Sequence, residues 1–339
     1  LLKAKIAKLK REQETEQVKK SAKKQDGFDV KRTGDATVVF IGLPSVGKST
    51  LLNRLTGSKS AIGAYQFTTL TVVPGVMNYR GARIQVLDLP GIIKGASTGK
   101  GLGKRILSVA RSADIVLLVL DVFQPYHEDV LINELGNIGI RLNQTPPDIV
   151  IEKSTTGGIA VAQQKKLKKM SEKLLKEILN IYGYTSARVV IKEDIESEQL
   201  IDFINGNKTY AKGITILNKI DLVDEKFLKN VSKKLKTDFI PTSADSNKNI
   251  NQLKERIYNE LQFIRVYLRP KGGETDFKEP LIVRKGNTVA DVCNKLHRNM
   301  KKDFRFGLVW GKSVKFGGQR VSLNHVLIDE DVLTVVKKR

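Results

Sequence analysis

The chain has 339 residues, which exceeds one typical hydrophobic core and suits two or three domains. Its one cysteine, Cys293, excludes an internal disulfide, and its three histidines lie far apart without further ligand-type residues at metal spacing. No apolar run approaches the length of a membrane span and no signal peptide is visible, so we expect a cytoplasmic protein without membrane contact. Because the sequence starts at Leu1 within a helical pattern, we expect that an upstream segment precedes it.

The net charge of +23 is concentrated at the two ends of the chain. Residues 1–34 carry 11 lysines and arginines against 5 acidic residues, and residues 265–339 carry 17 against 8. A basic surface can simply be solvated, but this concentration favours a polyanionic partner, for which we expect RNA and not DNA. Residues 1–25 have the pattern of a basic helix with Leu2, Ile6 and Leu9 on one face, and a linker follows up to residue 34.

The stretch 42–49 has the spacing G-x-x-x-x-G-K-S and stands between an apolar run, 37–41, and a helical pattern, 50–55. Strand, glycine loop and helix in this order predict a phosphate-binding loop, in which backbone N–H groups surround a diphosphate. Lys48 would reach the β- and γ-phosphates, and Ser49 would place its hydroxyl on Mg²⁺. A chance glycine turn is the alternative, and the motifs downstream make it the weaker one.

Two further motifs follow in the order that a GTPase requires. The segment 65–71 offers Thr69 to magnesium and the γ-phosphate, and the strand 83–87 leads into Asp88 and Gly91 of a D-x-x-G motif. Asp88 could hold magnesium through water, and Gly91 could donate its N–H to the γ-phosphate. Each motif alone is weak, because threonine-rich strands and Asp-Gly turns are common, but their order and spacing give them weight.

Guanine recognition is predicted at two later positions. An apolar strand leads into N-K-x-D, in which Asp221 accepts from the guanine edge, Asn218 braces the site and the stem of Lys219 packs on the base. The backbone of Ser243 and Ala244 is expected to meet the guanine carbonyl. Adenine lacks the paired donor edge, so we expect the site to take GTP or GDP with Mg²⁺ and to reject ATP.

The predicted site residues fall into three groups. The catalytic candidates are Lys48, Thr69 and Gly91, and the magnesium ligands are Ser49, Thr69 and Asp88. The nucleotide contacts are Gly42, Pro44, Ser45, Val46, Gly47, Lys48, Ser49, Thr50, Asn218, Lys219, Asp221, Ser243 and Ala244.

The spacing of these motifs also predicts the domains. Asp88 and Asn218 lie 130 residues apart, about 70 more than a bare nucleotide domain of this type requires. We therefore expect an α/β GTPase domain with a doubly wound, mostly parallel sheet at 35–140 and 212–264, interrupted by a small α+β subdomain at 141–211. Within that subdomain the pattern predicts strands at 149–151 and 188–191 and a basic helix at 163–181, whose lysines suit a solvated face better than an RNA contact.

The last 75 residues, 265–339, have the pattern of a β-grasp domain. Short β-rich segments surround one helix that is predicted from 289 to about 300. Trp310 lies within an apolar strand, which favours a core position over stacking on a base. With few exposed aromatic candidates, the basic surface of this domain is expected to contact the shape and backbone of RNA, with the N-terminal basic helix as a second anchor.

These motifs resemble those of the developmentally regulated GTP-binding (DRG) proteins, a branch of the Obg-like GTPases, over nearly the whole chain. The match is close at 42–52, 67–71, 88–96, 139–143 and 308–311. The resemblance implies an N-terminal helical domain, a GTPase core with an inserted domain, a C-terminal TGS domain and work on or near ribosomes. It also allows a partner protein of the kind known for eukaryotic members, although no residue of this sequence points to one.

Hydrolysis of GTP to GDP and phosphate is expected to be slow in isolation. Many GTPases orient the attacking water with a glutamine just after D-x-x-G, but this chain has Ile92 there, which cannot polarise water. Ser45 stands where potassium-using relatives usually carry asparagine, which leaves activation by K⁺ open.

Two classes of function remain for the whole chain. In the first, it is a ribosome-associated switch in translation, with Thr69 and the segment 91–103 ordering only when the γ-phosphate is present. In the second, nucleotide stabilises a scaffold that binds RNA or ribosomes constitutively. The five glycines of the segment 91–103 favour the switch.

Overall fold

The computed structural model describes residues 33–57, 73–89 and 109–338. The expectations for the N-terminal helix, Thr69 and Gly91 fall outside these residues. The chain forms two compact units, one containing Val30–Glu134 with Lys212–Arg339 and the other containing Leu135–Ala211, and each is described by itself. In the described part of the chain, no helix combines the length and the apolar character needed to cross a membrane.

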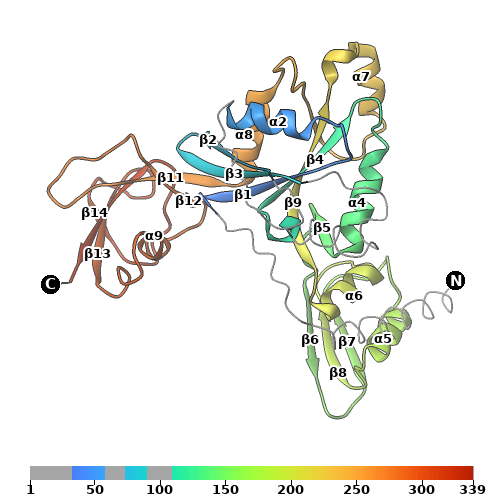
Figure 1. The fold of residues 1–339 in the computed structure, drawn as a ribbon. Coiled ribbons are helices and arrows are strands. Elements are labelled where there is room, and N and C mark those ends of the chain that lie inside the picture. The colour runs from blue at the N-terminus through green and yellow to red at the C-terminus, as the bar shows by residue number, and fades with distance from the viewer. Residues whose placement is uncertain (1–32, 58–72, 90–108, 339) are drawn as a thin grey trace. The chain divides into compact units, whose positions relative to one another are not determined.

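The larger unit is built on a sheet with the strand order β10-β9-β4-β1-β3-β2 (Figure 1). The short strand β5 belongs to the smaller unit and pairs with the first residues of β9, which belong to that unit as well. The strands are β1 (Ala36–Ile41), β2 (Val73–Tyr79), β3 (Ala82–Asp88), β4 (Ile115–Asp121), β5 (Ile140–Leu142), β9 (Thr209–Asn218) and β10 (Phe239–Pro241). Only the β2–β3 pair is antiparallel. All six residues of β1 are buried, as expected for a central parallel strand covered on both faces. The predicted doubly wound, mostly parallel sheet is therefore confirmed.

Helices follow the strands of this sheet. They are α2 (Lys48–Thr56), α4 (His127–Asn137), the 3-10 turn η1 (Ile220–Leu222), α7 (Glu225–Ser232) and α8 (Ile250–Glu260). Leu51 of α2 and both Leu253 and Ile257 of α8 are fully buried in one core with Phe40 of β1. Figure 1 shows α2 and α8 side by side, and their shared core holds the glycine loop, which lies between β1 and α2, against the sheet.

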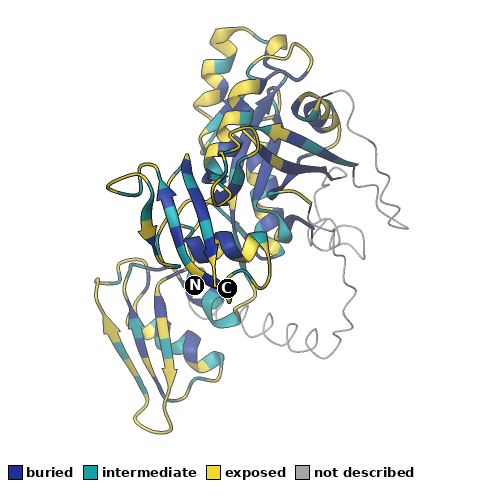
Figure 2. Cartoon of the chain, turned by 90° about the vertical axis from the view of Figure 1, so that its left-hand side faces the viewer, coloured by how far each residue is buried: buried dark blue, intermediate teal, exposed yellow. Residues whose placement is uncertain are grey.

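The C-terminal domain is a five-stranded sheet with one helix, in the order β12-β11-β15-β13-β14. Its elements are β11 (Phe263–Leu268), β12 (Leu281–Arg284), α9 (Val289–Leu296), β13 (Phe304–Trp310), β14 (Gln319–Val321) and β15 (Asp331–Lys337). Buried and partly exposed residues alternate along its strands (Figure 2), because one face packs on α9. The predicted helix up to residue 300 is too long, since α9 ends at Leu296 and His297 is extended at φ −161°.

The C-terminal domain and the GTPase domain belong to the same compact unit. Ile282 of β12 is 3% exposed and belongs to the hydrophobic core of the GTPase sheet. Arg284 donates to Asp114 Oδ1 at 2.5 Å, and Lys295 Nζ lies 2.8 Å from Asp35 Oδ1. Asp114 also accepts the N–H of Thr37 at 2.8 Å, so the first ion pair is anchored on β1.

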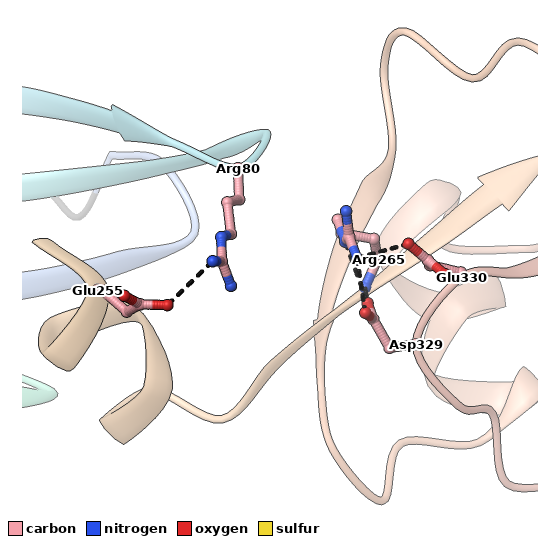
Figure 3. Close-up of polar contacts among 5 residues, drawn as sticks. All are labelled: Arg80, Glu255, Arg265, Asp329 and Glu330. Atoms are coloured by element: carbon pink, nitrogen blue, oxygen red, sulfur yellow. Dashed lines mark hydrogen bonds and ion pairs between the residues drawn. The ribbon is translucent and has the colours of Figure 1, made fainter.

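Arginines stand on both sides of the connection from α8 to β11 (Figure 3). Arg80 donates to Glu255 of α8 at 3.0 Å, within the GTPase domain. Arg265 of β11 pairs with Asp329 at 2.7 Å and with Glu330 at 2.8 Å, within the C-terminal domain. The hydrogen bond to Asp329 raises the pKa of Arg265 above its usual value, so this guanidinium is neutralised by its own domain.

The smaller unit has a core of its own. Its sheet has the order β6-β8-β7, and its elements are β6 (Ile149–Lys153), β7 (Ile159–Gln163), α5 (Glu172–Ile181), β8 (Ala187–Ile191) and α6 (Ser197–Asn205). Leu175, Ile178 and Leu179 of α5 are completely buried against this sheet. The predicted α+β subdomain is thus present.

The prediction of a helix from residue 163 was wrong, because α5 begins only after Ser171. The Ser171 hydroxyl accepts the N–H of Leu174 at 3.2 Å and caps the helix. Before it, the N–H groups of Lys168 and Lys169 donate to Asp194 Oδ1 at 2.9 and 3.2 Å. These side-chain acceptors satisfy N–H groups that a longer helix would have used.

We expect Ile178→Ala to loosen the smaller unit without affecting the larger one. The substitution leaves a cavity in a fully buried site, which costs about 2–5 kcal/mol. Because the two units have separate cores, amide hydrogen exchange should accelerate in β6, β7 and β8 and stay unchanged in β1 and β4. Lys173→Ala, on the exposed side of the same helix, is the control and should change neither. Equal acceleration in both sheets would contradict separate cores.

Candidate nucleotide site

The predicted site residues that the structure describes lie at the carboxyl ends of neighbouring parallel strands. Phe40 near the end of β1 is in register with Asp88 at the end of β3, and Asp121 at the end of β4 is in register with Asn218 at the end of β9. In open α/β sheets, ligands bind at this edge.

The glycine loop requires its two glycines for steric reasons. A Cβ on Gly42 would stand 2.6 Å from the carbonyl oxygen of Val119, and a Cβ on Gly47 would stand 2.3 Å from Asn218 Nδ2. Gly47 also has φ 93°, and Ser45 has φ 62°. The loop therefore turns through left-handed backbone conformations that bring its N–H groups inward, as a phosphate-binding loop needs.

Lys48 and Ser49 begin α2 at the mouth of this loop. Lys48 is 8% exposed, and its amine donates to the carbonyls of Gly42 at 3.2 Å and Leu43 at 2.9 Å. Burial lowers the pKa of Lys48, and the nearby Asp88 carboxylate only partly opposes this shift. A cation held next to a free helix N-terminus is a suitable partner for phosphate oxygens.

Asp88 is the carboxylate closest to Ser49, whose hydroxyl donates to Asp88 Oδ2 at 2.5 Å. Burial raises the pKa of Asp88, and the Ser49 hydroxyl and the Lys48 charge lower it by less. Among the described atoms, Asp88 Oδ1 is buried and has no hydrogen-bond partner. One hydroxyl and one carboxylate with a spare oxygen fit Mg²⁺, which takes few protein ligands beside water and phosphate. When bound, magnesium supplies positive charge against the phosphates.

Asn218 joins the glycine loop to the guanine side of the site. It is 2% exposed, its Nδ2 donates to the Val46 carbonyl at 2.8 Å, and its Oδ1 accepts the N–H of Ala244 at 3.1 Å. The N–H of Ser243 donates to the carbonyl of Lys248 at 3.1 Å. Both backbone N–H groups that we expected at the guanine carbonyl are thus engaged within the protein, and Ala244 could meet it only by sharing its N–H.

Lys219 precedes the 3-10 turn η1 after β9, and Asp221 is its middle residue. Lys219 has φ 67°, and its amine lies 2.7 Å from Asp121 Oδ2, an acceptor that the sequence interpretation missed. The available signal was an aspartate at the end of the apolar run of β4, the same position that Asp88 has on β3. Asp221 is exposed and has no hydrogen-bond partner in the described part of the chain, so its carboxylate is free to accept from a ligand.

Arg54 is a second residue that sequence interpretation missed. From the last turn of α2 its Nε donates to the Ala244 carbonyl at 2.8 Å, and its Nη2 donates to the Asp245 carbonyl at 2.9 Å. The helix that begins at the phosphate loop therefore also holds the loop after β10 in place. No sequence pattern signals a contact between residues 190 positions apart.

Of the remaining predicted contacts, Pro44 is exposed and Thr50 is half-buried at the start of α2. Thr69 and Gly91 lie outside the described residues, so their roles stay predictions.

The described residues bring together three parts on one sheet edge. These are the glycine loop, the Ser49–Asp88 pair, whose oxygens suit magnesium, and the loops in which guanine recognition was predicted. This arrangement defines the nucleotide site of a P-loop GTPase.

Comparison with known proteins identifies the family. A model described as a 50S ribosome-binding GTPase matches residues 37–153, one for the C-terminal region of that domain matches 156–263, and the TGS domain model matches 264–337. An uncharacterized GTP-binding protein of Methanocaldococcus jannaschii is 51% identical and covers all of this chain and 86% of the relative. Developmentally-regulated GTP-binding protein 1 of Xenopus laevis is 44% identical over 100% of this chain and 92% of the relative. Ribosome-interacting GTPase 1 of Saccharomyces cerevisiae is 42% identical over 99% of this chain and 92% of the relative. The chain belongs to the DRG family of GTP-binding proteins, as the sequence motifs predicted, and its C-terminal domain is a TGS domain.

We expect Gly47→Ala to lower the affinity for GTP by about tenfold or more. The new methyl group would collide with Asn218 Nδ2. The backbone of the alanine would also be held at an unfavourable positive φ, which costs about 1–3 kcal/mol of strain. Gly57→Ala is the matched control, because Gly57 has φ 78° but nothing within 4 Å of its Cβ position. Titration calorimetry with GTP should therefore show a loss for the first variant and little change for the second, and similar losses in both would contradict the steric explanation.

Proposed function

We propose that this chain binds GTP and GDP with Mg²⁺, hydrolyses GTP slowly on its own, and acts as a ribosome-associated switch in the cytoplasm. The observation that carries the nucleotide part is the double hydrogen bond of Asn218, to Val46 in the glycine loop and to Ala244 in the guanine loop. It makes the phosphate and base subsites one structural unit. Lys48 would hold the β- and γ-phosphates, and Ser49 and Asp88 would hold the magnesium ion.

The proposed ribosomal role is supported by the names of a relative and of a matching family model, and by the positive charge of the C-terminal domain. The yeast relative is named a ribosome-interacting GTPase, and one matching family model carries a 50S ribosome-binding description. Residues 265–339 carry 17 basic against 8 acidic residues, which suits contact with ribosomal RNA.

Slow hydrolysis follows from the residue after D-x-x-G. Ile92 cannot orient a water molecule, so another group, supplied by a partner or a monovalent cation, must complete the reaction. Turnover measured in potassium and in sodium buffer, with and without ribosomes, tests this point. Fast turnover that depends on neither would contradict it.

Asp221→Asn should move the nucleotide preference from guanine toward xanthine. The amide replaces an acceptor by a donor that faces the guanine N–H groups, whereas the xanthine edge presents a carbonyl to it. We expect the affinity for GDP to fall about 10- to 150-fold, the loss of a charge-assisted hydrogen-bond pair of about 1.5–3 kcal/mol, and the affinity for xanthosine diphosphate to rise.

The control for this prediction is Asp238→Asn, an aspartate whose side chain is 78% exposed and pairs with Arg256 away from the site. It removes the same charge and should leave calorimetric affinities unchanged. Equal binding of ATP and GTP by the unaltered chain, or an unchanged guanine preference in Asp221→Asn, would overturn the assignment of the guanine subsite.

A switch should hold the ribosome differently in its two nucleotide states. We expect co-sedimentation with ribosomes to be stronger with a non-hydrolysable GTP analogue than with GDP, and limited proteolysis to show protection of residues 91–103 with the analogue alone. Identical sedimentation and digestion in both states would favour a constitutive scaffold. No sedimentation in either state would reject the ribosomal role.

A further inference from the structure

The TGS sheet has two faces that are covered differently. Along the register of β11, β15 and β13, Leu268, Leu333 and Val309 form one row, which packs in the core with α9. The next row, formed by Tyr267, Val332 and Trp310, points to the opposite face, because successive residues of a strand alternate.

This opposite face is covered at its β12 end, and Thr334 and Val336 of the central strand β15 are also buried. At β12, Ile282 is buried in the core of the GTPase domain. Toward β13 and β14 the residues of this face are half-buried or exposed. We call this part the open face, and its residues are Tyr267, Arg269, Phe306, Leu308, Trp310 and Arg320.

Arginines and aromatic rings are paired on the open face. The guanidinium carbon of Arg320 lies 4.1 Å from the centre of the Phe306 ring, and that of Arg305 lies 6.0 Å from it. The guanidinium of Arg269 lies over Trp310 at 5.0 Å. These distances are those of cation–π contacts. The contacts hold the guanidinium groups of the three arginines beside the Phe306 and Trp310 rings.

These three arginines keep their charge available. In the described part of the chain, no carboxylate pairs with Arg269, Arg305 or Arg320, whereas Arg265 at the covered end is neutralised by Asp329 and Glu330 (Figure 3). The open face itself contains no acidic residue. Its charge complements a polyanion and disfavours a basic protein surface.

Two exposed aromatic side chains border the open face. Phe277 is 64% exposed, and its ring centre lies 5.0 Å from that of Tyr267. Phe316 is 65% exposed and directly precedes Gly317 and Gly318, whose backbone lies close to the Trp310 ring, since a Cβ on Gly317 would stand 2.8 Å from its Cδ1. Trp310 is therefore held in place on the surface of the sheet. The expectation that it lies in the core was wrong, because it is half-buried in the row of β13 that faces away from α9.

We propose that the open face of the TGS sheet binds single-stranded RNA, with phosphates on Arg269, Arg305 and Arg320 and unpaired bases stacked on the exposed rings of Phe277 and Phe316 at its border. The inference rests on the proposed ribosomal role and adds to it a contact surface and a class of RNA. Binding through the RNA backbone alone would need positively charged side chains but no aromatic rings. Rings beside unpaired arginines form a stacking platform, which can take bases only where they are not paired.

The test compares two double variants of the full chain that remove the same charge. Arg305→Gln/Arg320→Gln alters the open face, and Lys285→Gln/Lys301→Gln alters exposed lysines elsewhere in the domain, Lys301 being close to Asp291 on α9. Fluorescence anisotropy with a labelled oligouridylate should show a loss of about tenfold or more for the first pair and about threefold or less for the second. Equal losses of affinity in the two double variants would mean that RNA binding depends on net charge alone and would overturn the proposal.

Phe316→Ala tests stacking separately from charge. It should weaken oligouridylate binding about fivefold or more without changing the dependence of affinity on salt, because no phosphate contact is lost. A hairpin duplex RNA with the same number of phosphates should be bound more weakly than oligouridylate and should be insensitive to this variant. Unchanged oligouridylate binding by Phe316→Ala, or preference for the duplex, would contradict a single-strand platform.

Ribosome co-sedimentation separates failure of this inference from failure of the proposed function. If the unaltered chain does not sediment with ribosomes, the proposed function fails. If it does, and the open-face pair sediments at the unaltered level across a salt series while GTP binding is intact, only the open-face assignment fails. Loss of sedimentation with unchanged oligouridylate binding would indicate a ribosomal protein as the occupant and would also overturn it.

Discussion

The buried side chain of Asn218 is the contact on which the nucleotide site depends. It donates to Val46 in the loop after β1 and accepts from Ala244 in the loop after β10, so one amide fixes the distance between phosphate and base subsites. Its position leaves no room for a side chain at residue 47. Arg54 strengthens the same connection from the other side by donating to the carbonyls of Ala244 and Asp245. The glycine loop and the loop after β10 are thereby connected through packing and hydrogen bonds.

A second constraint is electrostatic. Lys48 and Asp88 are both buried, and burial shifts the pKa of each toward the neutral form. Such desolvated charges are costly until a partner compensates them. Phosphate oxygens can compensate the amine of Lys48, and a divalent cation can compensate the unpartnered Oδ1 of Asp88. In the proposed function the site is in this sense preorganised, since the groups that cost stability without a ligand are those proposed to bind it.

The TGS domain shows how one face of a sheet can be divided between two tasks. Near β12, Ile282 and the Arg284–Asp114 ion pair attach the domain to the GTPase sheet. Near β13 and β14, the same face carries arginines that have no acidic partner among the described residues. Removing the whole domain would expose the hydrophobic contact of Ile282, so single side-chain changes are the cleaner way to separate RNA contact from nucleotide binding. The nucleotide site and the open face are then testable independently.

The sequence by itself determined the GTPase class, the order of the motifs and the family, because each motif is local: a few adjacent residues specify a loop, its ligand and the strand before it. It also indicated the inserted subdomain through spacing alone. The tertiary structure decided which residues meet across long distances in the chain. The contacts of Asp121 with Lys219, of Arg54 with Ala244 and of Asn218 with the Ala244 N–H depend on strand order. The start of α5 depends on Asp194, more than 20 residues downstream, and the position of Trp310 outside the core depends on which face α9 covers. Local patterns cannot contain this information, because side-chain partners and covered faces are chosen only when distant elements pack together.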